Sequence, residues 1–426
     1  MNSAQTCPRC GAIVPTSARW CASCGPMTAT RTGTNRGIGR LRAAGLLVAG
    51  LLVAGLALAG AGLATLALVR PPLPGTFSRT GSMSVQREGH TATLLQDGRV
   101  LVAGGGYGCC DEFTDLSSAE IYDPATGTFS PTGSIAEVQD GDTATLLTDG
   151  RVLMVSGSTA ELYNPKNGKF TTTGSLLQSM DFVRTATRLH DGRVLVTGYD
   201  ESQSGTRSQW EYKPLAELYD PSTGTFSVTG AQIDGCLSDS ATPLEDGQVL
   251  FVGCGDGGDS DGSAQAELYN PSTGSFATTG LMTKPRTGPD ATLLGDGRVL
   301  ITGGYSNTSD GLQPLLASAE IYSPATGTFS ATGDMTEARQ GHTATLLRSG
   351  KVLIAGGLGN GDDPNLDSAE LFDPATGRFS QTLWRMVTDR RGDTATLLRD
   401  GRVLIAGGEG GDNLPPQLSS AEIYNP

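Results

Sequence analysis

Residues 90–105 read HTATLLQDGRVLVAGG, and this stretch decides the fold because it encodes two short strands and the turn between them. Thr, Val and Leu favour β-structure in both runs. The dipeptide Asp97-Gly98 supplies the positive φ angles that a two-residue hairpin turn requires. We therefore predict an antiparallel hairpin, and the unbroken apolar second strand indicates a sheet that is covered on both faces.

The same hairpin recurs along the chain. Its Asp-Gly-Arg-Val-Leu marker, with small changes, begins at seven positions that lie 42 to 55 residues apart: Asp97, Asp149, Asp191, Asp246, Asp296, Ser349 and Asp400. Each repeat continues with a variable loop, a strand like Ala119–Pro124, a Pro-Ala-Thr-Gly turn and a short strand near Phe129. Four strands in a period near 50 residues predict the blades of a β-propeller.

The two ends of this region indicate how many blades there are. The sequence stops at Ala421-Glu-Ile-Tyr-Asn-Pro426, in the middle of a turn whose continuation, Gly75-Thr-Phe77, stands where the repeats begin. We expect seven blades, the last of which takes strands from both ends. Pairing of those terminal strands closes the ring and protects edges that would otherwise be open.

The repeats resemble the kelch family over residues 74–426. The family's double glycine after the second strand is present at Gly104-Gly105, Gly303-Gly304, Gly356-Gly357 and Gly407-Gly408, and the Tyr-Asp-Pro turn recurs. Repeats two to four depart from the pattern with Ser156-Gly157, Gly198-Tyr199 and Gly253-Cys254, and Phe replaces the family's usual Trp. The resemblance implies an all-β fold, a seven-bladed kelch-type propeller over residues 70–426.

A long apolar segment precedes the repeats. Residues 43–69 carry no charge, and they exceed the ~20 residues that a helix needs to cross a bilayer. Arginines are concentrated before this segment, in a basic linker at 28–42, which places the N-terminus in the cytoplasm and the propeller outside. A cleaved signal peptide is the alternative, although its apolar core is usually only ~7–15 residues long. We predict a single-pass cell-membrane protein.

Residues 1–27 contain two Cys-x2-Cys pairs, Cys7 with Cys10 and Cys21 with Cys24. Four thiolates in this spacing favour tetrahedral Zn²⁺, and the segment resembles the short zinc ribbon at the start of many bacterial membrane proteins. Two disulfides are the alternative, but a cytoplasmic segment is kept reduced. With all four ligands from the protein, the zinc is expected to be structural.

Polar residues gather where the innermost strand of each repeat begins. Alignment on the Asp-Gly marker places one set at the strand entrance: His90, Asp142, Arg184, Asp239, Pro289, His342 and Asp393. A second set stands three residues earlier: Arg87, Gln139, Asp181, Cys236, Arg286, Arg339 and Arg390. Around a shared channel mouth they form a candidate site for a carboxylate, a sugar or a cation. The alternative is an ordinary polar channel, because the kelch pattern itself carries Arg and His there.

Catalytic motifs are sparse. Some kelch propellers are copper radical oxidases such as galactose oxidase, which need two tyrosines and two histidines around copper, one Tyr followed directly by His. This sequence has no Tyr-His pair, and its only histidines are His90, His190 and His342. It has no G-x-S-x-G elbow. One glutamate recurs in every repeat, which favours a structural role: Glu120, Glu161, Glu217, Glu267, Glu320, Glu370 and Glu422.

The loops offer further candidates. Residues 256–262 hold oxygen ligands and turn glycines that suit Ca²⁺, although full EF-hand spacing is missing and a solvated acidic loop is the alternative. Cys236 and Cys254 fall at one end of a hairpin, where a disulfide is plausible, and adjacent Cys109 and Cys110 fit either a vicinal disulfide or a reactive thiol pair. Several loop aromatics suit sugar stacking or protein contact: Tyr107, Phe113, Trp210, Tyr212 and Tyr305.

The net charge of −14 excludes nucleic acid as a partner of the large domain, since phosphate binding needs clustered Lys and Arg. We expect a membrane-anchored binding or scaffold module for a protein or glycan, and not an enzyme. A carbohydrate-active enzyme or a galactose oxidase-like oxidase is the first alternative. A structural protein of the cell envelope is the second.

Overall fold

The computed structural model describes residues 73–426 except 109–112, 138–141, 204–209, 234–239, 254–262, 307–312, 361–364 and 411–416. It also describes the backbone of four short strands near the N-terminus. The chain divides into two compact units, Met1–Pro72 and Leu73–Pro426. In the first unit, β1 (Ala4–Thr6) pairs with β2 (Ile13–Pro15), and β3 (Trp20–Cys21) pairs with β4 (Gly25–Pro26).

The predicted zinc ribbon and membrane helix fall mostly outside the described residues. Cys7, Cys10, Cys24 and residues 27–72 lie there, and Cys21 is described only as part of the backbone of β3. Within the described part of the chain, no helix is long and apolar enough to cross a membrane. The anchor and the ribbon therefore remain predictions from the sequence.

The second unit consists of seven four-stranded antiparallel sheets, which confirms the predicted all-β propeller. Blades 1 to 3 are formed by β6 (Thr91–Leu94), β7 (Val100–Ala103), β10 (Ser118–Asp123), β11 (Thr128–Ser134); β12 (Thr143–Leu146), β13 (Val152–Ser156), β14 (Thr159–Asn164), β15 (Lys169–Thr172); and β16 (Phe182–Arg188), β17 (Val194–Gln203), β18 (Trp210–Asp220), β19 (Thr225–Val228). Blades 4 and 5 are formed by β20 (Ser240–Pro243), β21 (Val249–Val252), β22 (Glu267–Asn270), β23 (Ser275–Thr278); and β24 (Asp290–Leu293), β25 (Val299–Thr302), β26 (Ala319–Ser323), β27 (Thr328–Ala331). Blades 6 and 7 are formed by β28 (Thr343–Leu346), β29 (Val352–Ala355), β30 (Ala369–Asp373), β31 (Arg378–Gln381); and β32 (Thr394–Leu397), β33 (Val403–Ala406), β34 (Ala421–Asn425), β5 (Thr76–Arg79). A short extra pair, β8 (Gly106–Tyr107) and β9 (Thr114–Asp115), extends blade 1.

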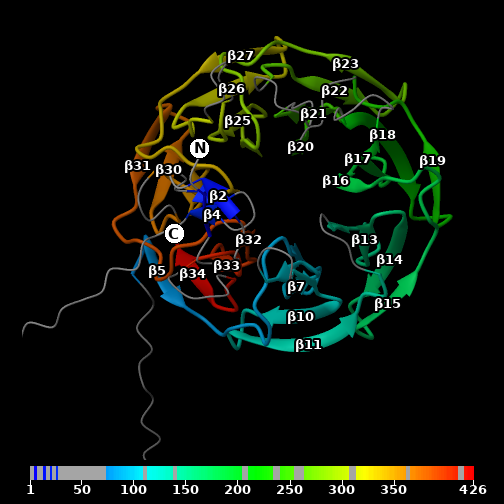
Figure 1. Cartoon of the computed structure of the whole chain (residues 1–426), viewed down its shortest axis with the longest axis horizontal. Coiled ribbons are helices and arrows are strands. Elements are labelled where there is room, and N and C mark those ends of the chain that lie inside the picture. Colours follow the sequence, from blue (N-terminus) through cyan, green and yellow to red (C-terminus); the bar gives the residue numbers. More distant parts are fainter. Residues whose placement is uncertain are drawn as a thin grey trace, which may run out of the picture. The chain divides into compact units, whose positions relative to one another are not determined.

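The ring closes as the sequence predicted. β5, the first strand of this unit, pairs antiparallel with β34, the last, from Thr76 opposite Asn425 to Arg79 opposite Glu422. Figure 1 shows the blades in chain order around a central opening, with β5 completing blade 7 as its outer strand. The two ends of the repeat region are therefore held within one sheet.

Hydrophobic clusters fill the junctions between blades. Between blades 7 and 1, Val100, Val102 and Tyr122 pack against Leu404 and Ile423. The second strands are buried at every residue in β7, β13, β21, β25, β29 and β33, which confirms that neighbouring blades cover both faces. Each buried Val, Leu or Ile contributes roughly 1.5–3 kcal/mol, so these strands dominate the stability of the ring.

The two ends of the ring differ in their loops. At one end, here called the loop face, inner strands begin and second strands lead to third strands. At the opposite end, the turn face, Asp-Gly turns join inner and second strands. Blade 3 is irregular on the loop face because β17 and β18 contain 10 and 11 residues, whereas β7 and β21 contain four. This long hairpin stays paired out to Gln203 opposite Trp210.

Candidate functional site

Four of the predicted ring residues are fully buried arginines, and they face the interior of their blades. In blade 5, the Arg286 Nη1 donates to the carbonyl oxygens of Gly303 and Ser318, at 2.9 and 3.1 Å. Its Nη2 lies 2.6 Å from Glu320 Oε1. Glu320 in turn accepts hydrogen bonds from the amides of Thr283 and Lys284. The same arrangement recurs at Arg87, Arg339 and Arg390, paired with Glu120, Glu370 and Glu422.

The segment that leads into the inner strand of each blade is here called the entry loop. These arginines hold the entry loop to the second and third strands of the same blade. They are 0% exposed, so they present no guanidinium to a ligand in the channel. The recurrent glutamates are likewise anchors for the entry loop: where no arginine is present, as in blade 3, Glu217 still accepts the amides of Leu177 and Gln178. The four arginines of the second predicted set are thus placed inside the scaffold, whereas Asp181 of the same set is exposed.

The two histidines at strand entrances lie between blades. His342 Nε2 is 2.8 Å from Thr302 Oγ1 of the preceding blade, and a Cβ added to Gly303 would lie 2.6 Å from His342 Cε1. His90 is packed against Gly407 in the same manner. Burial, with nearby arginines second, lowers the pKa of each histidine to about 3, so both are neutral at physiological pH. The first glycine of the double-glycine motif makes room for these rings.

Two carboxylates on the loop face, Asp393 and Asp290, have raised pKa values. Asp393 occupies the position of His90 and His342 but is shorter. It is 7% exposed, and neither of its oxygens meets a hydrogen-bond partner from the other described residues. Asp290, the half-buried first residue of β24, accepts a hydrogen bond from the amide of Ala344 on the next inner strand. Burial raises the pKa of both carboxyls to about 7.

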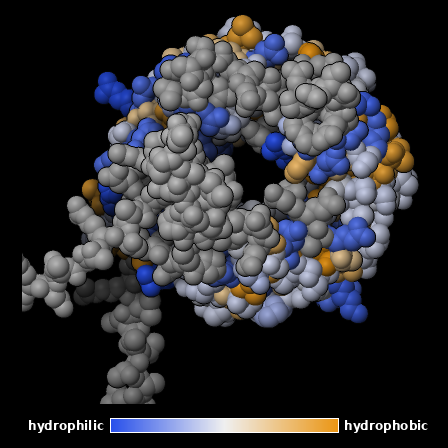
Figure 2. All heavy atoms as spheres, viewed as in Figure 1, coloured by the Kyte–Doolittle hydropathy of each residue, from blue (hydrophilic) through white to orange (hydrophobic). Residues whose placement is uncertain are grey.

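Asp393 was among the residues predicted from the sequence, and Asp290 was not. A signal was present, because the six equivalent positions in the other blades all hold a hydroxyl residue: Thr91, Thr143, Thr185, Ser240, Thr343 and Thr394. A carboxylate that replaces one of seven repeated hydroxyls at a channel-lining position is a departure from the repeat and hence a candidate for function. Hydrophilic residues border part of the central opening in Figure 2.

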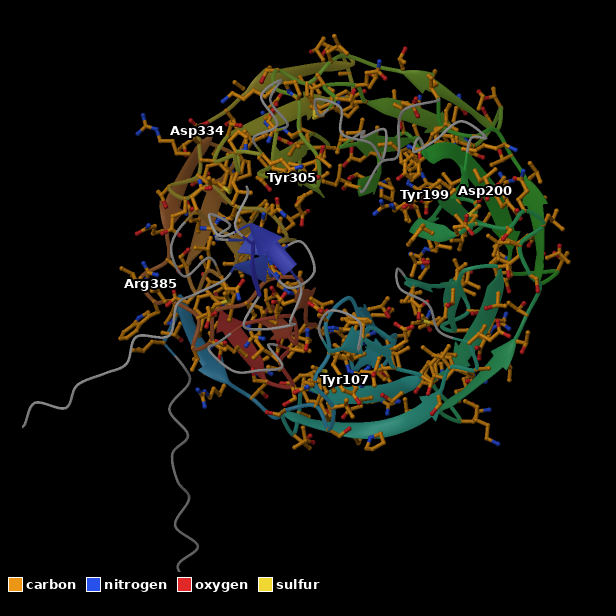
Figure 3. The ribbon with its side chains drawn as sticks, viewed as in Figure 1. Tyr107, Tyr199, Asp200, Tyr305, Asp334 and Arg385 are labelled. Atoms are coloured by element: carbon orange, nitrogen blue, oxygen red, sulfur yellow. The ribbon has the colours of Figure 1, made fainter. Side chains whose placement is uncertain are left out.

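Blade 3 carries an aromatic cluster at the base of its long hairpin. The Tyr199 ring lies 5.2 Å from Phe182 and 5.4 Å from Tyr212, edge-on to the latter. The Arg184 guanidinium stands 5.2 Å from the Tyr199 ring centre. Tyr199 is buried by these neighbours, so the cluster stiffens the hairpin, while Phe182 and Tyr212 remain half-buried. Figure 3 shows Tyr199 and Asp200 on the opposite side of the ring from Arg385.

The remaining predicted residues divide into described and undescribed ones. Asp142 is buried beside Gly104, Phe113 is exposed, and Tyr107 and Tyr305 are half-buried on the loop face. Six predicted residues and the acidic loop at 256–262 lie outside the described residues: Cys109, Cys110, Gln139, Cys236, Asp239 and Cys254. Among the described residues, no group of three or more His, Cys, Asp or Glu side chains is placed to hold a metal ion.

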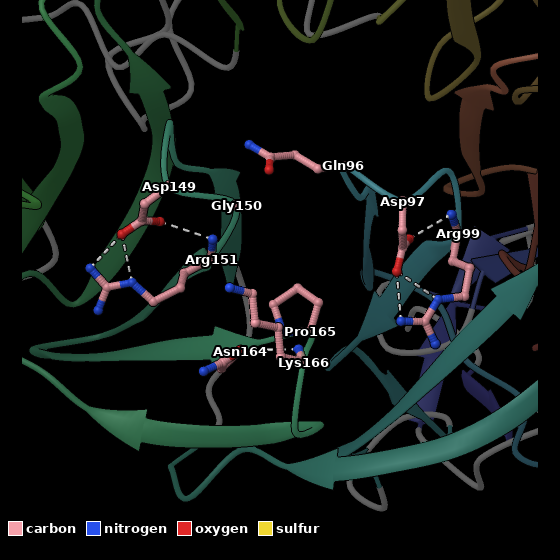
Figure 4. Close-up of a pocket in the computed structure, with 9 residues that line it drawn as sticks. All are labelled: Gln96, Asp97, Arg99, Asp149, Gly150, Arg151, Asn164, Pro165 and Lys166. Carbon is pink, nitrogen blue, oxygen red and sulfur yellow. Dashed lines mark hydrogen bonds and ion pairs between the residues drawn. The ribbon is translucent and has the colours of Figure 1, made fainter.

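Open cavities occur on the turn face. One of about 540 Å³ lies between the Asp-Gly turns of blades 1 and 2 and is drawn in Figure 4. Its two arginines are already paired within their own turns, since Arg99 and Arg151 each lie 2.7 Å from the aspartate two residues earlier. A second cavity of about 660 Å³ between blades 3 and 4 is lined by His190.

No family model and no curated protein matches this sequence. Among solved structures, the propeller is similar to a fungal alcohol oxidase of the AA5 family in complex with copper, a structure described as a novel oxidase with catalytic diversity. The match covers 83% of this chain and 76% of that chain, with 19% identity and a TM-score of 0.64. At this identity the likeness establishes a shared propeller fold.

This comparison contradicts our prediction that the chain is not an enzyme. That prediction rested on missing motifs, whereas the similar solved propeller is an alcohol oxidase. A copper centre, however, does not fit the donors of this chain. His90 and His342 are held between blades by their contacts, and His190 lines a turn-face cavity, so the three histidines do not converge.

Proposed function

We propose that this chain is a carbohydrate-active enzyme that uses acid–base chemistry on the loop face, with Asp290 and Asp393 as its proton-exchanging carboxylates. One observation carries the proposal: burial raises the pKa of both side chains to about 7. At neutral pH such groups are divided between acid and base forms, the condition that general acid–base catalysis requires. Asp290 is half-buried at the start of inner strand β24, where it would meet a hydroxyl-bearing ligand in the central opening.

A glycan is the proposed substrate class. The similar solved structure is an alcohol oxidase, and the hydroxyl groups of a glycan belong to the same chemical class. The stiff hairpin of blade 3 adds half-buried aromatic rings beside Arg184, a combination that suits a sugar face. The acidic surface is consistent with a neutral ligand and opposes nucleic acid.

The setting of the enzyme is proposed from the sequence. The apolar segment 43–69 would anchor the chain in the cell membrane with the propeller outside, and Cys7, Cys10, Cys21 and Cys24 would hold a structural zinc ion in the cytoplasm. The loop at 256–262 is retained as a candidate Ca²⁺ site on its oxygen ligands.

The proposal is tested with the full-length chain in detergent and a panel of oligosaccharides and glycosides, with products identified by mass spectrometry. Asp290→Asn and Asp393→Asn should each reduce turnover by roughly 10²–10⁴-fold, the usual contribution of a general acid or base. Asp334→Asn is the matched control, because Asp334 is exposed and lies away from the central opening (Figure 3). Glycan binding without turnover would overturn the enzyme, and self-association without any small ligand would favour an envelope scaffold.

A further inference from the structure

The junction between blades 6 and 7 breaks a rule that the other six junctions follow, and all seven lie within the described residues. In the six regular junctions, a threonine after the outer strand is followed by a glycine whose amide donates to the turn glycine of the next blade. Gly333, for example, donates to the Gly377 carbonyl oxygen at 2.9 Å. At the seventh junction, Leu383-Trp384-Arg385 stands where Gly333-Asp334 stands in the sixth, so one residue is added and the glycine is lost.

The added residues are directed outward. Leu383 is 90% exposed and Trp384 is 56% exposed. The hydroxyl of Thr382 donates to the Trp384 carbonyl oxygen at 2.7 Å. In five other junctions, the equivalent threonine instead contacts the tyrosine hydroxyl of the next blade, as Thr80 does with Tyr122. A local hydrogen bond thus holds the exposed turn in place of an inter-blade one.

Further apolar residues lie at the same junction. Gly75 is the turn glycine of blade 7, and a Cβ there would meet nothing within 4 Å, whereas Gly377 is packed against a threonine. Leu73, two residues before Gly75, is 68% exposed. Val387 is also exposed, and its amide donates to Glu422 of blade 7. We call Leu73, Leu383, Trp384 and Val387 the seam surface.

The seam surface differs from the other exposed apolar residues of the described structure. At the junctions before blades 3 and 5 single residues are exposed, Leu177 and Leu281, and at the junction before blade 4 two are exposed, Val228 and Ile233. The seam surface gathers four, and it has basic neighbours. Arg79 is exposed on β5, and the Arg385 side chain, on the outer rim in Figure 3, is 61% exposed beside Asp367.

The length of chain before Leu73 identifies what covers this surface. Only Arg70, Pro71 and Pro72 separate Leu73 from the apolar segment that ends at Val69. Three residues span at most about 10 Å even when fully extended. A membrane crossed by residues 43–69 would therefore lie close to Leu73. Trp and Leu partition into the headgroup region of a bilayer, and arginines pair with its phosphates.

We propose that the seam surface rests in the headgroup region of the membrane that residues 43–69 cross, and so fixes the propeller edge-on to the bilayer. This inference rests on the proposed membrane anchor and is independent of the proposed acid–base chemistry. A tether of three residues limits distance but leaves rotation free. The seam surface supplies a second point of attachment, which restricts that rotation.

The test uses the full-length chain in phosphatidylcholine vesicles with brominated or ordinary acyl chains. The sequence has three tryptophans, Trp20, Trp210 and Trp384. In the double variant Trp20→Phe/Trp210→Phe, Trp384 is the remaining fluorophore and should lose most of its emission in brominated lipid. The matched control is Trp20→Phe/Trp384→Phe, in which Trp210 on β18 of blade 3 should emit equally in both lipids.

The other possible results each overturn a defined part of the proposal. Equal Trp384 emission in both lipids, with the chain retained on the vesicles after an alkaline carbonate wash, would overturn the seam contact alone. Release of the chain by the wash would overturn the anchor and the seam contact together. Neither result would touch turnover by the detergent-solubilised chain, so failure here is distinct from failure of the proposed enzyme. Crosslinking between two copies of the chain at position 383, together with unquenched Trp384 emission, would assign the seam surface to contact with a second copy.

Discussion

Substitution of Glu320 by Gln tests whether the buried arginines are structural pins. Arg286 and Glu320 are 0% and 1% exposed and lie 2.6 Å apart. Gln keeps the shape of Glu but removes the charge, and so Arg286 would remain buried without a counter-charge. Breaking a buried ion pair from one side costs roughly 3–5 kcal/mol. In a chain of this size that loss should lower the thermal midpoint by several degrees and the urea midpoint in proportion.

Glu267 provides the matched control in blade 4. It has the same position in its blade, is fully buried and accepts the amide of Ile233, but Cys236 stands in the sequence where Arg286 stands in blade 5. Burial raises the pKa of Glu267 to about 7. Because its folded pKa lies above 4.5, ionisation opposes folding, and its contribution to stability falls as pH rises from about 4.5 to about 7. Glu267→Gln should therefore be more stabilising at pH 8 than at pH 6.

The assay is urea unfolding followed by circular dichroism at pH 6 and pH 8. Glu320→Gln should be destabilised at both values, because the substitution removes the buried counter-charge of Arg286. Equal midpoints for wild type and Glu320→Gln would refute the interpretation of the arginines as pins. Equal losses in the two variants would show that the glutamate's bonds to backbone amides, and not the ion pair, carry the stability.

Three further outcomes are expected. The pKa of about 7 for Asp393, in place of 3.8, means that the wild type loses stability as pH rises from about 4 to 8, by up to roughly 4 kcal/mol, and Asp393→Asn should flatten this profile in urea titrations. Gly303→Ala places a Cβ 2.6 Å from His342 at a φ of +62° and should cost about 3 kcal/mol, whereas Gly350→Ala, at +80° with nothing within 4 Å, should cost about 1 kcal/mol by thermal unfolding. Metal analysis should find one zinc ion per full-length chain and none after Cys21→Ser, and copper that copurifies with the chain would contradict the donor argument given above.

The propeller was predictable because its local signals agree and are repeated. Asp97-Gly98 fixes a hairpin turn, the second strand after it is apolar on both faces, and the split turn between Pro426 and Gly75 indicates ring closure. None of these depends on long-range geometry. The long hairpin of blade 3 was not predicted, because its extension from Tyr199 to Gln203 is polar and carries no repeated turn dipeptide.

The site was less predictable for a different reason. Register along a strand places Arg286 and His342 near the channel, but it does not say where a long side chain ends. The guanidinium of Arg286 reaches back to Glu320 on the third strand, and the His342 ring lies over Gly303 of the preceding blade. Asp290 was not predicted because the alignment of repeats emphasises positions that are charged in several blades, whereas this position is charged in one blade only.

The seven repeats nevertheless form an internal alignment that contains the missing contacts. Blades 1, 5, 6 and 7 have the arginine, the double glycine and a serine before the Ala-Glu of the third strand, and blades 2, 3 and 4 lack all three together. The structure supplies the cause, because one guanidinium bonds the first glycine's carbonyl, the serine and the glutamate, as Arg339 does with Gly356, Ser368 and Glu370. Residues that vary together lie together. Blade 3, whose hairpin extends from the loop face, is one of the three blades without this pin.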